Sequence, residues 1–167
     1  MQYDRKITIS AGSNRRAMTW QAQTMLISEL WARLQAPARG TETLAAYLNM
    51  KKAQQDDLKD VGGFMAGTLS GPRRKANNVT GRDVITLDLD NIPSGGTEDV
   101  LRRVEALGCG YCIYSTRKHS PAAPRLRVLL PTDRTMTADE YEPCARKMAE
   151  YIGLELMDPT TFEVSRL

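Results

Sequence analysis

The sequence predicts a single α+β domain in which helices pack on one face of a split βαβ sheet. From residue 64 onward the expected elements run strand, strand, helix, strand, strand, helix. In the expected strands apolar residues recur at about every second position, and in the expected helices at about every third or fourth. The length of 167 residues allows one compact domain with a core but falls short of two comfortable ones. No internal repeat or low-complexity linker divides residues 1–167.

The N-terminal part of the sequence predicts a smaller αβ unit. A strand is expected over residues 5–9, and helices over residues 18–34 and 43–58, where apolar residues recur at helical spacing. A further strand is expected over residues 64–69. These segments precede the main sheet.

The C-terminal part predicts helices that alternate with strands. A helix is expected over residues 97–108, and strands over 111–116 and 126–130. A capping-box sequence then opens a helix over residues 137–153, which a glycine ends. These helices supply the layer that covers one face of the sheet.

Residues 84–91 are the most informative stretch, an apolar strand that ends in two acids. Alternation places the apolar residues 85, 87 and 89 on one face and Asp88 and Asp90 on the other. The two acids lie about 6.6 Å apart along the backbone, close enough to share an ion. Two such carboxylates repel unless a cation neutralises them, and divalent metals with a phosphate substrate form a site for phosphoryl or nucleotidyl transfer. The stretch therefore predicts a metal-dependent transferase.

Two other interpretations of this motif stay open. Acids at a strand end also occur in the first turn of a loop, and Asp-Asn before Pro93 is common turn chemistry. A hydrophobic strand ending in Asp-x-Asp also opens haloacid dehalogenase-like phosphatases, in which Asp88 would be the nucleophile. The later acidic pair of those enzymes has no Asp-Asp counterpart after residue 90. An EF-hand is excluded because Pro93 stands where the loop requires glycine.

Cationic side chains flank the acidic strand on both sides in the sequence. Those considered for nucleic-acid contact are Arg73, Arg74, Lys75, Arg82, Arg117 and Lys118. The first three lie in a turn between two strands, from which they could reach a phosphate bound at the acids. The alternative is a solvated hairpin loop.

A second polar cluster surrounds His119, the only histidine of the chain. Arg125 and Arg127 share one face of the strand that follows, and Ser115 and Thr116 precede the turn. Such a set could hold a triphosphate through charge-assisted hydrogen bonds. A basic, solvent-facing hairpin is the alternative.

The last stretch of the sequence supplies a third carboxylate. Asp158 lies at the end of a short apolar segment. Glu155 and Glu163 are its competitors, and the sequence leaves the choice between Asp158 and Glu163 open.

The bulk composition permits nucleic-acid binding without requiring it. The formal net charge is +3, and the sequence pI is about 8.8. No apolar run is long enough to span a bilayer, and residues 1–20 lack a signal-peptide stretch, so we expect a cytoplasmic protein with no membrane partner. The three cysteines form no disulfide framework, and Cys109 and Cys112 precede a strand rather than a helix, which argues against a redox or zinc site.

Taken in order, three motifs resemble the archaeo-eukaryotic primase superfamily. They are Asp88-x-Asp90, the strand and turn with His119 followed by Pro-Arg-Leu-Arg, and Asp158-Pro-Thr-Thr-Phe before Ser-Arg-Leu. The resemblance is in particular to the primase-polymerase domains at the front of phage and plasmid replication proteins. It extends from about residue 60 to the end of the chain, and more loosely before it. It implies an RRM-like antiparallel or mixed sheet with helices packed on it, joined to an N-terminal αβ unit.

The resemblance also implies template-directed nucleotide polymerisation with Mg²⁺ or Mn²⁺. By position, Asp88, Asp90 and Asp158 would be the catalytic metal ligands, and His119 would contact the nucleotide phosphates. The family has a small residue two positions before the histidine, where this chain has Arg117. The full set expected to bind the nucleotide is His119, Ser115, Thr116, Arg125, Arg127 and Lys75. The set expected to contact the template is Arg73, Arg74, Arg82, Arg117 and Lys118.

The expected partners are NTP or dNTP, a single-stranded DNA template, and a helicase domain or partner, because relatives continue beyond the end of this chain. Removal of one acid is expected to cost orders of magnitude in rate and to leave folding intact. The alternative function is a non-catalytic nucleic-acid-binding module of RRM-like shape. Aromatic residues make up only 6% of the chain, and acids on the working face repel a polyanion, so the sequence favours the enzyme.

Overall fold

The structure, a computed structural model, describes residues 3–167 and has the expected α+β architecture. The strands are β1 (Lys6–Gly12), β2 (Gln21–Leu26), β3 (Gly63–Met65), β4 (Gly67–Leu69), β5 (Val79–Leu89), β6 (Cys112–Ser115) and β7 (Leu126–Met136). The α-helices are α1 (Ile27–Leu34), α2 (Leu44–Asn49), α3 (Lys52–Lys59), α4 (Thr97–Glu105) and α5 (Ala138–Ile152). Short 3₁₀ turns are η1 (Ala76–Asn78), η2 (Leu154–Leu156) and η3 (Pro159–Phe162). Among these described residues, no helix has both the length and the apolar character needed to cross a bilayer.

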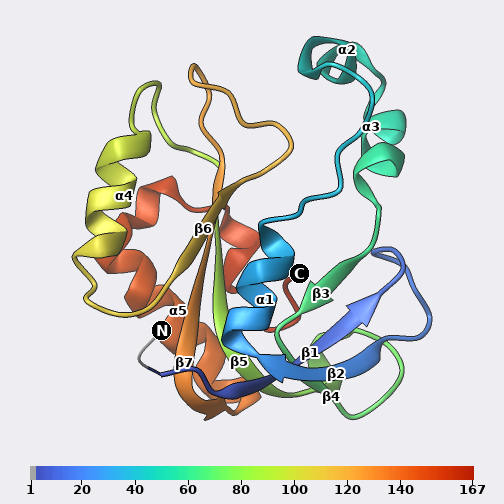
Figure 1. The fold of residues 1–167 in the computed structure, drawn as a ribbon, viewed down its shortest axis with the longest axis vertical. Coiled ribbons are helices and arrows are strands. Elements are labelled where there is room, and N and C mark those ends of the chain that lie inside the picture. The colour runs from blue at the N-terminus through green and yellow to red at the C-terminus, as the bar shows by residue number, and fades with distance from the viewer. Residues whose placement is uncertain (1–2) are drawn as a thin grey trace.

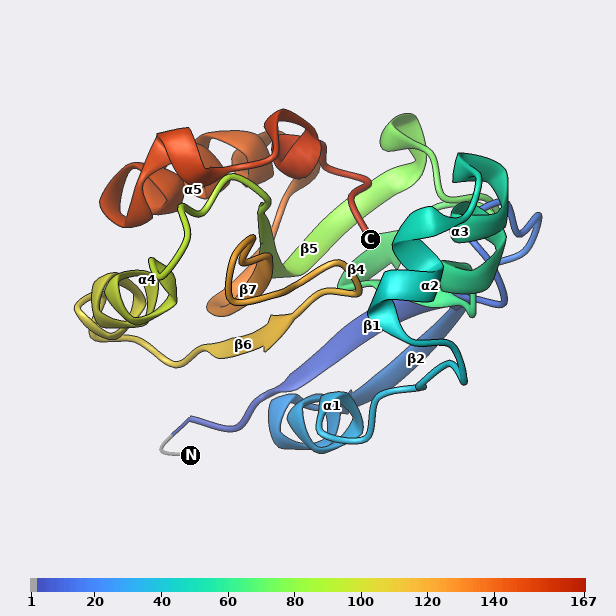
Figure 2. The same ribbon diagram turned by 90° about the horizontal axis from the view of Figure 1, so that it is seen from above.

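Two antiparallel sheets form the framework (Figure 1). The first has the strand order β2-β1-β3, and the second has the order β4-β5-β7-β6. In Figure 2, α4 and α5 lie on one side of the second sheet, and β1, β2 and α1 lie on the other. The curled second sheet is compatible with an RRM-like arrangement. The predicted fold class is therefore confirmed.

Strand β5 lies inside the second sheet, between β4 and β7, and both of its faces are covered. Ile85, Leu87 and Leu89 point into an apolar core shared with α4 and α5. Val84 belongs to a second core, formed with β1 and α1. The alternation expected for residues 84–91 is confirmed, and Asp88 lies further along the face that carries Val84.

The N-terminal region differs from the sequence prediction at the first helix. The helix expected over residues 18–34 begins only at Ile27, and residues 21–26 form β2 instead. This segment pairs with β1, and Met25 lies opposite Ile7. Inter-strand pairing and burial of Met25 therefore outweigh the helical spacing of the apolar residues.

Two further predicted elements are each divided in the structure. The helix expected over residues 43–58 becomes α2 and α3, because Met50 and Lys51 have extended backbone between them. The strand expected over residues 64–69 becomes β3 in the first sheet and β4 in the second. The buried Ala66 lies at the division, where the chain passes from one sheet to the other.

Candidate active site

The chain that follows α5 docks on an open edge of β5. Strand β4 pairs with β5 only as far as Arg82, which leaves that edge of β5 free for other partners. The N–H of Asp158 donates to the carbonyl of Asp88 at 2.8 Å, and Met157 forms an antiparallel bridge with Leu89. Two acids that are far apart in the sequence therefore lie side by side.

Side-chain hydroxyl groups complete the hydrogen bonding of this edge. The hydroxyl of Thr161 accepts from the N–H of Asp88 at 2.7 Å and donates to the carbonyl of Thr86 at 3.2 Å. The hydroxyl of Tyr141 lies 3.3 Å from both the N–H and the carbonyl of Thr86. Both hydroxyl-bearing residues are fully buried, so they satisfy backbone groups that water does not reach.

Arg127 neutralises Asp88 from the neighbouring strand. The two residues lie opposite each other in the β5–β7 register. The guanidinium donates from Nε to Oδ1 at 2.6 Å and from Nη2 to Oδ2 at 3.0 Å. Burial by itself lowers the pKa of Arg127, but the charge and hydrogen bonds of Asp88 raise that pKa above its ordinary value. Arg127 therefore stays charged beside a carboxyl group that is only 3% exposed.

Arg166 joins Asp88 to Asp158. Its Nε donates to Oδ2 of Asp88 at 2.8 Å, and its Nη2 donates to Oδ2 of Asp158 at 3.0 Å. Burial works to raise the pKa of Asp158, but hydrogen bonds from Thr160 and the charge of Arg166 lower it below the ordinary value. One guanidinium thus occupies the position between two carboxylates that a divalent cation would share.

The three acids are not equivalent as metal ligands. Asp88 and Asp158 supply carboxylate oxygens of the kind that Mg²⁺ and Mn²⁺ prefer, and they already share one cationic group. Asp90 pairs instead with Arg125. In the described chain, no three His, Cys, Asp or Glu residues are close enough to form a metal-binding group. The carboxylates of Asp88 and Asp158 are donors of the type that would suit a divalent ion, and Asp90 would add a third only if Arg125 released it.

A cavity of about 640 Å³ opens over these ion pairs. Residues of β3, β5, β6 and β7 line it together with residues of α2, α3 and the last segment of the chain. Eight cationic side chains line the cavity, against the four carboxylates of Asp60, Asp88, Asp90 and Glu163. The cations are Arg15, Lys59, Arg74, Arg117, Lys118, Arg125, Arg127 and Arg166. Its volume and excess of positive charge suit an anionic ligand the size of a nucleotide.

The residues predicted to bind the nucleotide divide into two groups. Those that line the cavity are Thr116, Arg125 and Arg127, and those that do not are His119, Ser115 and Lys75. His119 instead supports the adjacent strand, because its Nδ1 accepts the backbone N–H of Arg125 at 3.1 Å. His119 therefore does not line the cavity but holds the backbone of Arg125, which does.

The residues predicted to contact the template also divide. Arg74, Arg117 and Lys118 line the cavity, and Arg73 is exposed outside it. The prediction for Arg82 is wrong, because its side chain is fully buried.

Arg82 has a structural role instead. It donates to the carbonyls of Val164 and Arg166 at 2.8 and 3.1 Å, and its guanidinium lies 4.3 Å from the centroid of the Tyr141 ring. It therefore fixes the segment that carries Arg166. No local pattern predicts this role, because the partners lie about eighty positions further along the chain.

Arg117 connects the turn after β6 to the α2–α3 segment, which stands out from the body of the molecule (Figure 1). Its guanidinium forms an ion pair with Glu42 and lies 4.7 Å from the centroid of the Tyr47 ring. Tyr47 is buried and also lines the cavity. The α2–α3 segment is thus held as one wall of the site.

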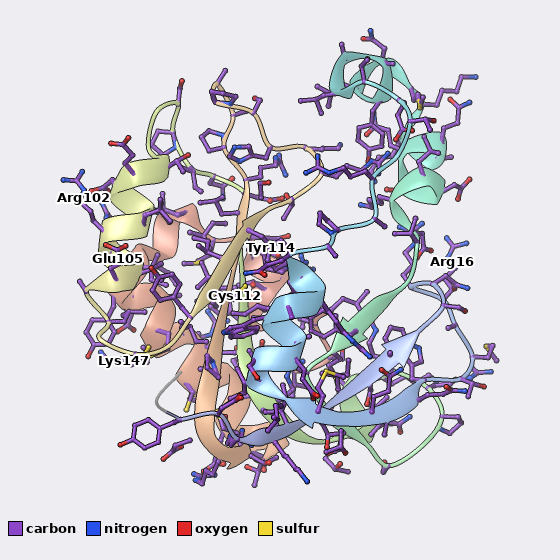
Figure 3. The ribbon with its side chains drawn as sticks, viewed as in Figure 1. Arg16, Arg102, Glu105, Cys112, Tyr114 and Lys147 are labelled. Atoms are coloured by element: carbon purple, nitrogen blue, oxygen red, sulfur yellow. The ribbon has the colours of Figure 1, made fainter. Side chains whose placement is uncertain are left out.

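Several residues of the site were not predicted from the sequence, among them Arg15, Tyr114 and Arg166. Arg166 had no signal beyond its place in the final Ser-Arg-Leu, and nothing marked Arg15. Tyr114, labelled on β6 in Figure 3, lies opposite Arg127 in the β6–β7 register. Tyr114 was expected to lie on the strand of residues 111–116, next to the strand that carries Arg125 and Arg127. Side-chain alternation along that strand was therefore the signal that could have placed it on the same face. Burial raises the pKa of Tyr114, an effect that the neighbouring Arg127 opposes.

The fold and the site define an α+β domain whose carboxylates, held by arginines, lie in a basic cavity. Residues 1–167 match the VapE N-terminal domain family. The chain therefore belongs to this family, which is linked to phage and plasmid replication proteins. A search of curated proteins found no match, and a search of solved structures found none either.

Replacement of Thr161 tests the docking of the last segment on β5. Thr161→Val is expected to lower the free energy of unfolding by about 2 kcal/mol, because the amide of Asp88 and the carbonyl of Thr86 lose their partner. Thr161→Ser keeps the hydroxyl group and should cost about 1 kcal/mol or less. Urea denaturation measures both values, and equal losses would contradict the role of the hydroxyl.

Replacement of the acids one at a time tests how their ion pairs differ. Asp88→Ala is expected to lower the free energy of unfolding by about 3 kcal/mol or more, because it leaves Arg127 unpaired and largely buried. Asp90→Ala should cost about 1 kcal/mol or less, because a third of its ion pair is exposed to solvent. Equal unfolding free energies for the two variants would contradict this account. For Asp88, this prediction replaces the expectation that folding survives the loss of any acid.

Proposed function

We propose that the chain is a metal-dependent nucleotidyltransferase, a primase or polymerase that extends or starts strands on single-stranded DNA during replication of a mobile element. The observation that carries the proposal is the convergence of Asp88 and Asp158 on one cationic group, with Asp90 at the end of the same strand. The basic cavity above these acids and the link of the family to phage and plasmid replication proteins support it.

In this proposal Asp88, Asp90 and Asp158 would hold Mg²⁺ or Mn²⁺, and the metal would supply activation of a 3′-hydroxyl and charge stabilisation of the leaving pyrophosphate. The structure pairs these acids with arginines. Nucleotide phosphates compete for the same guanidinium groups, because a phosphate accepts bidentate hydrogen bonds in the same way as a carboxylate. Transfer of Arg125, Arg127 and Arg166 to the phosphates would free the carboxylate oxygens, and all three arginines line the cavity.

The other residues of the cavity position the substrates. Thr116 and Lys118 line it beside the arginines and can add donors to the phosphates. Phe64 and Tyr114 give the cavity a partly apolar wall, which suits a sugar and base. The substrates in this proposal are NTP or dNTP and a single-stranded DNA template, and a helicase domain or partner would open the duplex.

A specific observation favours a second function, a nucleic-acid-binding module without catalysis. Each of the three acids already has an arginine partner, so the site is electrostatically balanced without a metal. Such a module would bind a strand equally well with or without a metal and a nucleotide. A phosphatase that uses Asp88 as nucleophile has less support, because both oxygens of that carboxylate accept hydrogen bonds from Arg127 and Arg166.

Primer extension on a single-stranded template tests the proposal. NTPs and dNTPs are supplied with Mg²⁺ or Mn²⁺, with and without a primer. Asp90→Asn and Asp158→Asn are each expected to lower the rate of incorporation by about a hundredfold or more, because they remove charge stabilisation at the reacting phosphate. Glu155→Gln is the matched control, since Glu155 is an exposed acid three positions before Asp158 and does not line the cavity.

The outcomes separate the two functions. Full incorporation by Asp158→Asn, or an equal loss in Glu155→Gln, would contradict the assignment of the third acid. A parent protein that binds the template and incorporates no nucleotide with either metal would support the binding module instead. Circular dichroism of each variant distinguishes loss of activity from loss of the fold.

A further inference from the structure

Two loops beside the cavity carry a concentration of positive charge. Residues 13–20 join β1 to β2, and residues 70–78 join β4 to β5. Neither loop contains an aspartate or a glutamate. Their cations are Arg15, Arg16, Arg73, Arg74 and Lys75. We call the surface formed by these two loops the basic ledge.

Direct contacts hold the two loops together. The N–H of Trp20 in the first loop donates to the carbonyl of Pro72 in the second at 2.7 Å. The guanidinium of Arg74 lies 5.2 Å from the centroid of the Trp20 ring, which is itself buried. Within the second loop, the side-chain amide of Asn78 donates to the carbonyl of Arg73 at 2.9 Å. The basic ledge is therefore one preorganised surface rather than two independent loops.

The basic ledge is continuous with the cavity. Arg15 from the first loop and Arg74 from the second both line the cavity. Arg16, Arg73 and Lys75 are exposed outside it. Arg15 pairs with Asp56 and Asp60 at 3.6 and 3.7 Å, so Arg74 supplies the positive charge that links the exposed cations to the cavity.

The exposed cations of the basic ledge differ from those on α4 and α5. Every cation of α4 and α5 pairs with a carboxylate on its own helix, and these cations are Arg102, Arg103, Arg146 and Lys147. Arg16, Arg73 and Lys75 form no ion pair within residues 3–167. Their charge is not offset by the protein, so it is available to an external polyanion.

We propose that the basic ledge binds the sugar-phosphate backbone of the single-stranded nucleic acid that enters the cavity. The identity of this strand as a template or primer rests on the proposed function, and the ledge adds the loop of Arg15 and Arg16 to the residues that contact it. The only aromatic residue of the two loops, Trp20, is buried and cannot stack on a base. Binding at the ledge is therefore independent of base sequence, and its strength falls as salt rises.

The salt dependence of strand binding tests the proposal. A fluorescently labelled oligodeoxythymidine is titrated with protein at several salt concentrations in EDTA, and fluorescence anisotropy gives the affinity. The triple variant Arg16→Ala, Arg73→Ala, Lys75→Ala is expected to reduce the slope of log affinity against log salt by about 2, because each phosphate contact on a single strand contributes about 0.7. Its affinity at low salt should fall by about tenfold or more.

A matched control removes one arginine and one lysine from a distant surface, as the double variant Arg73→Ala, Lys75→Ala does from the ledge. Arg102 and Lys147 lie on the side of the molecule opposite Arg16 (Figure 3). The double variant Arg102→Ala, Lys147→Ala should keep the affinity and slope of the parent, whereas Arg73→Ala, Lys75→Ala should lower both. The proposal is overturned if the triple variant keeps the parent slope, if the control loses as much as the ledge variants, or if the parent does not bind the single strand at low salt.

This assay and the extension assay can fail separately. Strand binding by the ledge variants is measured without metal or nucleotide, whereas the loss of incorporation by Asp90→Asn, by about a hundredfold or more, is measured with both. Ledge-dependent binding by a parent that incorporates nothing would sustain the basic ledge and overturn the nucleotidyltransferase. Extension by a triple variant whose strand binding is unchanged would overturn the ledge alone.

Discussion

The hydrogen bond from the N–H of Asp158 to the carbonyl of Asp88 is the contact on which the site depends. Strand β4 stops pairing before the acidic end of β5, and the chain after α5 takes its place on that edge. The hydroxyl groups of Thr161 and Tyr141 satisfy the remaining backbone groups there. Without these contacts, the part of β5 that β4 does not reach would have buried backbone amides with no hydrogen-bond partner. The same docking that completes the sheet therefore brings the third acid to the first.

Charge balance is the second constraint on the site. Carboxylates that lie near one another in a partly buried position repel each other unless cations accompany them. Arg127, Arg166 and Arg125 supply that compensation from a neighbouring strand and from the final segment. Guanidinium groups bind phosphate as readily as carboxylate, so the arrangement that stabilises the folded chain is also one that an anionic substrate can rearrange. The basic cavity and the two cationic loops at its mouth extend this positive surface outward.

Local patterns in the sequence predicted the parts of the structure that depend on interactions between residues close together in the chain. The alternation in β5 and the spacing of Asp88 and Asp90 needed only strand geometry, and the later helices followed from their apolar periods and caps. Long-range pairing decided the features that the sequence could not predict. Residues 21–26 became a strand because β1 was available to pair with them, and Arg82 was buried because the last segment covers it. The place of Arg166 between two acids has the same origin, since nothing near it in the sequence predicts its partners.

Direct measurement of Mn²⁺ binding is the most decisive test of the central claim, that Asp88 and Asp158 together form a cation site. Electron paramagnetic resonance of free Mn²⁺ gives the affinity without requiring turnover. Asp158→Asn should weaken binding by about tenfold or more, since loss of a group that merely orients a ligand already costs that much. Arg166→Gln should strengthen it, because the competing guanidinium is gone. Equal Mn²⁺ affinity in the parent, Asp158→Asn and Arg166→Gln would contradict the account.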